Sequence, residues 1–338
     1  MNRIAIVVNG GFSGRWIAYC ERNGIDYKIV DPYASDIVQQ VADCTAFMWH
    51  HSHVDYRDTL FAKQLLYSLE QTGKRVFPDY RTTWHFDDKV GQKYLMEALG
   101  LPIVPSHVFY TKREALTWVE GTEFPKVFKL RGGSGAASVS LVKTRKQARR
   151  MVRKAFGRGF PQFDRKNHFK EHLIRARQGK ESLVAAWLKG CWRMVELPLH
   201  ARMRSPEKGY CYFQEFMPGN PYDIRVCVVN HRAFAIKRMT RKGDFRASGS
   251  GDIVYGRKEI DERCVEIAFE AARKLGTQCV GIDFVFDEER NPLMVEISFA
   301  FTPEGYDACD GYWEEDMTFV EGTHFDFCGW MVESVVEK

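Results

Sequence analysis

Two carboxylates stand in neighbouring apolar runs toward the carboxyl-terminal end of the chain. Asp283 lies in Gly281–Phe286 and Glu296 lies in Leu293–Ile297, with Asp287–Pro292 between them. This pattern predicts a β-hairpin that carries the two acids on adjacent strands. An inward carboxylate is costly to bury unless a partner compensates its charge. Two such acids with phosphate oxygens form a typical magnesium site, and a pair of satisfied structural carboxylates is the alternative.

A lysine and a glycine-rich turn follow one another within Phe124–Gly135. An ammonium group at a strand end, followed by small residues that expose backbone N–H groups, suits a nucleotide phosphate tail. The spacing fits neither a Walker loop nor a dinucleotide fingerprint, and Ser138–Val142 reads as a strand where those motifs need a helix. A plain hairpin turn explains the segment equally well. The residues concerned are Lys129, Gly132, Gly133, Ser134 and Gly135.

A third segment, Tyr212–Val226, is an apolar strand that turns at Pro218 and Gly219. Backbone groups at such a strand end could pair with the edge of an adenine base, and Asp223 could accept hydrogen bonds from ribose hydroxyls. A strand and turn with a surface aspartate is the equally good alternative.

The fourth segment, Ile236–Gly251, leads from basic residues into a loop of small ones. An arginine in such a place can hold a phosphate or carboxylate by two parallel hydrogen bonds. A solvated basic loop is the alternative.

Three units must position these segments, and their expected limits are 1–83, 84–210 and 211–338. Strands and helices alternate in the first unit, which predicts a small parallel α/β domain. A helix over Asp88–Leu99 opens the second unit, which also holds a basic stretch at 157–210 with weak periodicity, interpreted as an insertion. Antiparallel strands and a helix from Asp261 to Leu275, with Gly276 after its end, fill the third unit.

In this order and spacing the four segments resemble the ATP-grasp superfamily, in particular its glutamate-ligase and glutathione-synthetase-like branch. The combination Asp-Ile-Arg-Val, Gly-Asp-Phe-Arg and Gly-Ile-Asp-Phe…Val-Glu-Ile is specific as a set. The resemblance covers roughly Trp84–Thr302, and the preceding residues resemble the α/β domain found before ATP-grasp domains. It implies an α+β fold in which two subdomains clasp ATP between them.

The resemblance also implies roles at matching positions. Two lysines look like the contacts to ATP phosphates, namely Lys89 and Lys129. The hinge that pairs with adenine corresponds to Gln214, Glu215, Phe216 and Met217, and the ribose-binding acid to Asp223. The basic set facing the γ-phosphate and the acceptor carboxylate corresponds to Arg225, Lys237, Arg238 and Arg246. The metal-binding acids correspond to Asp283 and Glu296. One departure is Ser298, which stands where the family usually has an asparagine, and a hydroxyl is a poorer metal ligand than an amide oxygen.

The implied activity is that of a carboxylate–amine ligase that uses ATP and Mg²⁺ to form an acyl phosphate. A kinase-like phosphotransferase acting on an anionic small molecule is the second reading, and an ATP-binding protein without turnover is the third. The chain also looks similar to ATP-grasp proteins linked to bacterial surface-polysaccharide synthesis, which suggests an amino acid or sugar acid as substrate. A polyanion binder that uses Lys143–Lys180 is disfavoured because it leaves the acids and the glycine-rich turn without a purpose.

Composition is that of a soluble globular protein, with 45% hydrophobic and 28% charged residues among 338. No apolar stretch approaches the length of a membrane span, and the amino terminus does not resemble a signal peptide. We therefore expect a cytoplasmic protein with small-molecule partners and no nucleic-acid or membrane partner. Nine scattered cysteines without a Cys-x-x-Cys spacing indicate reduced, buried thiols. A homo-oligomer is compatible with the sequence, which does not specify the oligomeric state.

Overall fold

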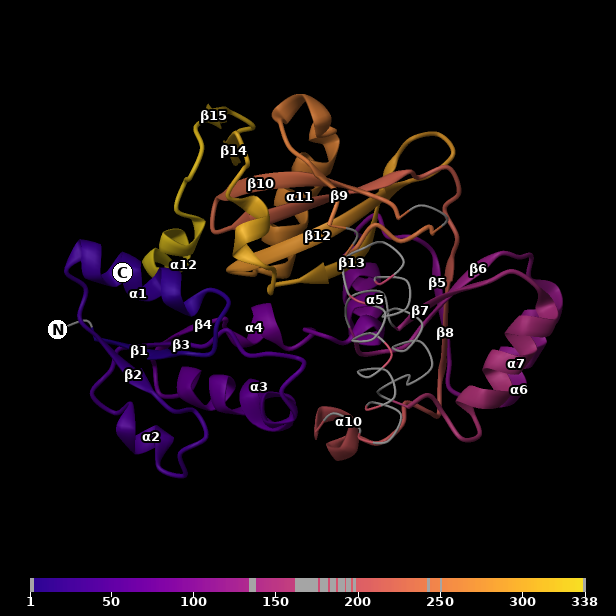
Figure 1. Cartoon of the computed structure of the whole chain (residues 1–338), viewed down its shortest axis with the longest axis horizontal. Coiled ribbons are helices and arrows are strands. Elements are labelled where there is room, and N and C mark those ends of the chain that lie inside the picture. The colour runs from indigo at the N-terminus through magenta and orange to yellow at the C-terminus, as the bar shows by residue number, and fades with distance from the viewer. Residues whose placement is uncertain are drawn as a thin grey trace.

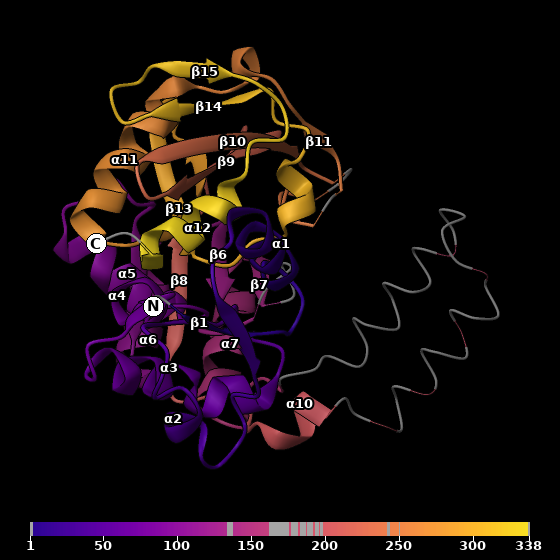
Figure 2. The ribbon, with the colours of Figure 1, turned by 90° about the vertical axis from the view of Figure 1, so that its left-hand side faces the viewer.

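Three β-sheets follow one another in the computed structural model of the chain (Figure 1). Figure 2 shows the same ribbon from the side, with the amino-terminal domain below the large sheet that contains β9 and β10. The structure describes residues 3–133, 138–161, 199–241, 244–249 and 251–336, together with positions 176, 182, 187, 192 and 196.

The amino-terminal domain is a parallel sheet in the order β2-β1-β3-β4, with helices on both faces. Successive residues of β1 point to opposite faces, so Ile4 and Ile6 pack against α1 while Ala5 and Val7 pack against α3. This confirms the predicted parallel α/β arrangement. The strands are β1 (Ile4–Val7), β2 (Tyr27–Val30), β3 (Ala46–Met48) and β4 (Arg75–Phe77), and the helices are α1 (Ser13–Asn23), α2 (Ile37–Gln40), α3 (Tyr56–Glu70) and α4 (Tyr80–Thr83).

A small antiparallel sheet in the order β5-β8-β6-β7 forms the second unit, with α6 and α7 packed on one face. The pleat directs Phe128 toward these helices, and it directs Val127 and Lys129 toward the opposite face. The elements are α5 (Lys89–Ala98), β5 (Ser106–Phe109), α6 (Lys112–Gly121), β6 (Lys126–Lys129), β7 (Val139–Val142), α7 (Arg145–Ala155), α10 (Leu199–Met203) and β8 (Cys211–Glu215).

The domain boundary expected between residues 210 and 211 does not match the strand pairing of the small sheet. Strand β8 bonds to both β5 and β6, so Cys211–Glu215 belongs to the small sheet and not to the third unit. The strand is central in a sheet whose other members lie before residue 143, and local pattern alone does not reveal such long-range pairing. Most of the basic insertion predicted at 157–210, including Cys191, lies outside the described residues.

The large sheet runs β13-β12-β9-β10-β14-β15, with β11 paired to β10. Helix α11 covers one face, where Ile224, Val226 and Val228 of β9 point. The alternate residues Asp223 and Arg225 point to the other face, toward the small sheet. The elements are β9 (Tyr222–Val229), β10 (Arg232–Met239), β11 (Ile253–Val254), α11 (Glu262–Leu275), β12 (Cys279–Phe286), β13 (Pro292–Ser298), β14 (Gly311–Glu314) and β15 (Phe319–Glu321).

The carboxyl-terminal helix α12 (Phe327–Val336) returns to the amino-terminal domain and lies beside α1 (Figure 1). Trp330 and Met331 join the same core as Trp16 and Ile4, and Arg75 of β4 donates a hydrogen bond to the Val336 carbonyl at 3.0 Å. The first and last segments of the chain therefore hold the parallel sheet against the large one.

No helix in the described part of the chain is long and apolar enough to span a membrane. Eight cysteines within it are free and buried, which confirms the prediction of reduced thiols for those positions.

Candidate functional site

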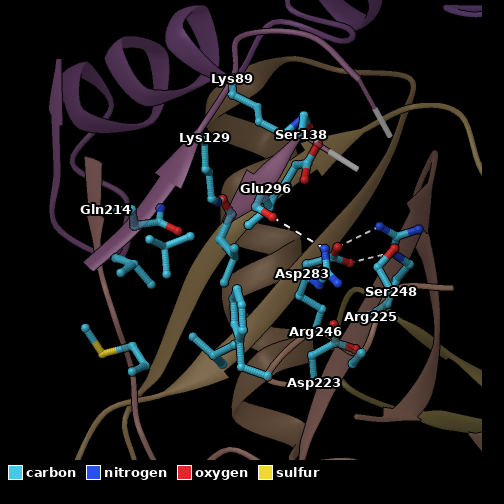
Figure 3. Close-up of a pocket in the computed structure, with 18 of the residues that line it drawn as sticks. Lys89, Lys129, Ser138, Gln214, Asp223, Arg225, Arg246, Ser248, Asp283 and Glu296 are labelled. Atoms are coloured by element: carbon cyan, nitrogen blue, oxygen red, sulfur yellow. Dashed lines mark hydrogen bonds and ion pairs between the residues drawn. The ribbon is translucent and has the colours of Figure 1, made fainter. Parts of the chain in front are cut away.

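A cavity of about 290 Å³ lies between the small and large sheets (Figure 3). The two sheets meet there at β6, β8, β12 and β13, and each contributes polar side chains. Most of the residues predicted from the sequence line this one cavity. They are Lys89, Lys129, Gly133, Gln214, Glu215, Phe216, Met217, Asp223, Arg225, Arg246, Asp283, Glu296 and Ser298.

The two acids of the predicted hairpin lie side by side on one wall of this cavity. Asp283 of β12 and Glu296 of β13 are register partners, and partners in an antiparallel pair extend from the same face of the sheet. The register shifts just after this pair, between Asp283 and Phe284. Both carboxylates therefore reach the cavity from adjacent strands, as the spacing predicted.

Asp283 is held by two arginines. Its Oδ2 accepts a hydrogen bond from Arg225 Nη2 at 2.7 Å, and Arg238 Nη2 lies 2.9 Å from its Oδ1. Arg238 also pairs with both carboxylate oxygens of Asp223 at 2.7 Å. Burial alone would raise the pKa of Asp283, but the two guanidinium groups outweigh it and hold that pKa well below its usual value. Asp283 is therefore an anion at any physiological pH.

Two buried lysines lie opposite these acids. Lys89 is the first residue of α5, a helix capped by Asp88, and its Nζ lies 3.1 Å from Glu296 Oε1. Lys129 ends β6, and its Nζ donates a hydrogen bond to the Val295 carbonyl at 3.4 Å. Burial lowers the pKa of Lys129 to about 8, the attraction of Glu296 opposes this, and the nearby Lys89 adds to it. An anion entering the cavity would be attracted by both ammonium groups.

The glycine-rich turn is tied to the start of α5. Gly133 donates its N–H to Asp87 Oδ1 at 2.7 Å and accepts a hydrogen bond at its carbonyl from Lys89 Nζ at 2.7 Å. Gly133 has a φ of +100°, in the region that favours glycine. Gly132 lines a neighbouring cavity instead, and Ser134 and Gly135 lie outside the described residues.

Comparison with solved structures agrees with the fold described above. A RimK domain ATP-grasp protein from Sphaerobacter thermophilus superposes with a TM-score of 0.59 at 14% identity, covering 99% of each chain. The D-alanine–D-alanine ligase from Bacillus anthracis, solved with ATP, gives a TM-score of 0.55 at 12% identity over 99% of this chain and 96% of that one. Residues 203–308 also match the family model described as a RimK-like ATP-grasp domain. The chain has the ATP-grasp fold.

Curated relatives match over part of their length. A probable α-L-glutamate ligase from Enterobacter sp. (strain 638) is 37% identical over 90 residues, which is 26% of this chain and 30% of that protein. The ribosomal protein bS6–L-glutamate ligase of Escherichia fergusonii is 35% identical over 94 residues, with the same shares. The matches thus span about 30% of each relative's length.

Part of the wall of this cavity is apolar. Val127, Val285 and Val295 line it, and Gln214 donates a hydrogen bond to Ser106 Oγ at 3.0 Å. Strand β8 ends at Glu215, so the residues after it, Phe216 and Met217, lie past the paired part of the sheet. This geometry suits a flat base that pairs with the backbone, and the adenine role stays a prediction.

The prediction that groups Lys237 with the basic residues of the site is wrong. The pleat of β10 sends Lys237 and Arg238 to opposite faces, and Lys237 Nζ pairs with Glu259 at 2.8 Å on the α11 side. Lys237 does not line the cavity, and Arg238 lies behind its wall as the partner of Asp223 and Asp283. Arg246 does line the cavity, and its Nη2 pairs with Asp244 at 2.6 Å.

The acids fit a magnesium ion better than Ser298 does. The Ser298 hydroxyl donates to the Ala300 carbonyl at 3.0 Å and accepts from the Ala300 N–H at 3.1 Å, so the turn occupies it from both sides. Over the described residues no group of three His, Cys, Asp or Glu side chains has the arrangement of a metal site. Asp283 and Glu296 would therefore complete a metal site only together with phosphate oxygens and water.

Several residues of the cavity wall were not among the sequence predictions, and two of them are Asp87 and Ser138. Asp87 lines the cavity and accepts a hydrogen bond from the Gly133 N–H. Its backbone φ of +55° is uncommon for a residue other than glycine. The sequence signal for a role of Asp87 is the pair Asp87-Asp88, because the amino-terminal cap of α5 needs only one of these two acids. Ser138 at the start of β7 also lines the cavity and donates to the Gly133 carbonyl at 3.1 Å.

The three histidines after β3 take different roles. His50 Nδ1 accepts from the Phe12 N–H at 3.4 Å, and His51 Nε2 hydrogen-bonds with Thr83 Oγ1 at 2.5 Å. His53 lines the cavity between the small and large sheets.

Proposed function

We propose that the protein is an ATP-dependent carboxylate–amine ligase that works through an acyl phosphate. The observation that carries this proposal is the convergence of Lys89, Lys129, Asp283 and Glu296 on one cavity of an ATP-grasp fold. The names of the similar proteins, two L-glutamate ligases and a D-alanine–D-alanine ligase, support a bond between a carboxylate and an amine.

In the first step a carboxylate oxygen of the substrate bonds to the γ-phosphorus of ATP, and ADP leaves with the electron pair of the broken P–O bond. Positioning and charge neutralisation dominate such transfers. Lys89, Lys129 and Arg246 are cations in the cavity wall that would offset the phosphate charge. Magnesium held by Asp283 and Glu296 would supply further positive charge against the triphosphate.

In the second step an amine nitrogen attacks the acyl carbon and inorganic phosphate leaves. Arg225 and Arg238 contribute by holding Asp283 in place and ionised. Asp223 lines the same cavity beside them, and its role toward the ribose stays a prediction.

We propose that the substrate is a small molecule, either an amino acid or a sugar acid. The names of the similar ligases favour L-glutamate as one of the two partners. A place in bacterial surface-glycan synthesis, in the cytoplasm, rests on the resemblance of the sequence alone.

A screen of phosphate release tests this function. Purified protein with Mg²⁺-ATP is offered a panel of amino acids and sugar acids, alone and in pairs, and free phosphate and products are measured. A ligase releases phosphate and forms an amide only when both partners are present. Phosphate retained on the product would instead identify a kinase-like transferase, and no turnover with any pair would leave an ATP-binding protein.

A further inference from the structure

Strand β13 is an edge of the large sheet and contains an irregularity beside one of the proposed metal-binding acids. Asp283 pairs with Glu296, whereas the next residue of β12 pairs with Met294. Val295 therefore has no counterpart in β12, which makes it the extra residue of a β-bulge. Bulges beside functional sites change the direction of neighbouring side chains, and the residue directly after this bulge is Glu296.

The backbone on both sides of the bulge is held from outside the sheet. Before the bulge, the Met294 N–H donates to the Pro102 carbonyl at 2.8 Å, and the Met294 carbonyl accepts from the Val104 N–H at 3.0 Å. After the bulge, the Ile297 N–H donates to Gln92 Oε1 at 3.3 Å. The outer edge of β13 is thus attached to α5 and to the segment that follows this helix.

Gln92 is a buried residue of α5, with 2% of its surface exposed, and both ends of its amide are bonded. Its Nε2 donates to the His85 carbonyl at 3.0 Å, and its Oε1 accepts from the Ile297 N–H. These partners fix the orientation of the amide, because an N–H only donates and a carbonyl only accepts. An apolar side chain here would leave the Ile297 N–H without this partner, which is costly for a buried group.

Helix α5 reaches the same acid in two ways. Lys89 and Gln92 lie three residues apart on its buried side. Lys89 Nζ lies 3.1 Å from the Glu296 carboxylate, and Gln92 holds the N–H of the next residue, Ile297. A phosphate bound at Lys89 would break the first contact, whereas the second joins buried groups outside the cavity wall. The second contact can therefore hold the backbone of Glu296 while the ion pair opens.

We propose that Gln92 is a positioning residue of the metal site, which fixes the bulge so that the carboxylates of Asp283 and Glu296 can reach one magnesium ion. This inference rests on the ATP- and Mg²⁺-dependent function proposed above. Gln92 does not line the cavity, so it acts through the backbone of β13 and not by touching a ligand. Loss of such an indirect partner typically lowers metal affinity by about 10- to 100-fold.

Gln92→Met tests this role, because methionine is similar in length and has no amide. The matched control is Gln278→Met, at the contact between the large sheet and the amino-terminal domain. Gln278 Nε2 donates to the Val76 carbonyl at 2.9 Å and its Oε1 accepts from the Asp79 N–H at 2.8 Å, away from the cavity wall. Binding of a non-hydrolysable ATP analogue to each full-length protein is measured by calorimetry over a range of Mg²⁺ concentrations.

We expect Gln92→Met to raise the Mg²⁺ concentration for half-maximal binding by about 10-fold or more, and to change the affinity at saturating Mg²⁺ by no more than about twofold. Gln278→Met should match the wild type in both quantities, although both variants should lower the denaturation midpoint. When Glu296→Gln is already present, Gln92→Met should not change the Mg²⁺ dependence further, because the acid through which Gln92 acts is gone.

An unchanged Mg²⁺ dependence in Gln92→Met, or an equal shift in Gln278→Met, would overturn the positioning role and leave the nucleotide site intact. A further shift on top of Glu296→Gln would overturn it as well, because Gln92 would then act through another group. A wild type that binds the analogue equally well without Mg²⁺, or does not bind it, would overturn the proposed nucleotide and metal sites and this inference with them.

Discussion

Lys89 and Glu296 approach within 3.1 Å although 206 residues separate them in sequence, and their contact joins the start of α5 to the large sheet. Both side chains border the cavity in which we place the triphosphate. A phosphate bound there would take the place of Glu296 beside Lys89. A metal ion bound there would take the place of Lys89 beside Glu296. The ion pair therefore links α5 to β13 at this cavity, and on the proposed function nucleotide binding would exchange it.

Replacement of Glu296 by glutamine should lower ATP-dependent phosphate release by at least about 100-fold. Loss of a partner that only orients a metal ligand already costs 10- to 100-fold, and Glu296 is a proposed ligand itself. The matched control is Glu289→Gln in the exposed turn between β12 and β13, which should leave the rate unchanged. Equal rates for the two variants across a magnesium titration would remove Glu296 from the metal site.

The affinity for ATP should fall as the pH rises above about 8, the value to which burial lowers the pKa of Lys129. Below that pH the ammonium is charged and attracts the triphosphate, and above it the free protein must first take up a proton. Calorimetric titration with Mg²⁺-ATP between about pH 7 and 9.5 would show this slope. In Lys129→Met the affinity should be weaker and nearly independent of pH, and an unchanged slope would assign the effect to another group.

Lys129 should also affect stability, in a direction set by its lowered pKa. Between about pH 8 and the ordinary lysine pKa of 10.5 the unfolded chain binds more protons than the folded one. The contribution of Lys129 to the free energy of unfolding therefore increases with pH across this window. Urea denaturation at several pH values should show a smaller increase in Lys129→Met than in the wild type.

Lys237→Met and Arg238→Met should differ sharply in stability. Lys237 forms a partly exposed pair with Glu259, which contributes at most about 1 kcal/mol. Arg238 is buried between Asp223 and Asp283, and its removal leaves carboxylates uncompensated, at a cost of about 3–5 kcal/mol. Similar denaturation midpoints for the two variants would contradict the opposite orientations reported for these neighbours.

Ser298→Ala should leave the magnesium dependence of the reaction unchanged, because the hydroxyl already bonds to both the N–H and the carbonyl of Ala300. We expect a loss of about 1 kcal/mol in the free energy of unfolding from the missing hydrogen bonds. A rise in the magnesium concentration needed for half-maximal rate would restore Ser298 as a metal ligand.

The sequence predicted the structure best where residues close together along the chain determine the local backbone. The apolar runs around Asp283 and Glu296 predicted a hairpin with two facing acids, and the helix cap at Asp261 and the stop at Gly276 match the ends of α11. Both features are local, so the residues that determine them lie within a few positions of one another.

The errors arose where distant contacts decide the outcome. Lys237 was grouped with Arg238 by charge, although a strand sends neighbours to opposite faces. The pairing of β8 with β5 and β6 depends on residues about 100 positions away, which no local window contains. The hydrogen bond between Gln92 and Ile297 likewise joins positions 205 residues apart, so only the structure places Gln92 beside the strand that carries Glu296.

A crystal structure with Mg²⁺ and a non-hydrolysable ATP analogue would test the central claim most directly. We predict the terminal phosphates beside the ammonium groups of Lys89 and Lys129, the metal on the carboxylates of Asp283 and Glu296, and the base next to Phe216 and Met217. A nucleotide bound elsewhere, or one in this cavity whose phosphates lie away from both lysines, would contradict the account.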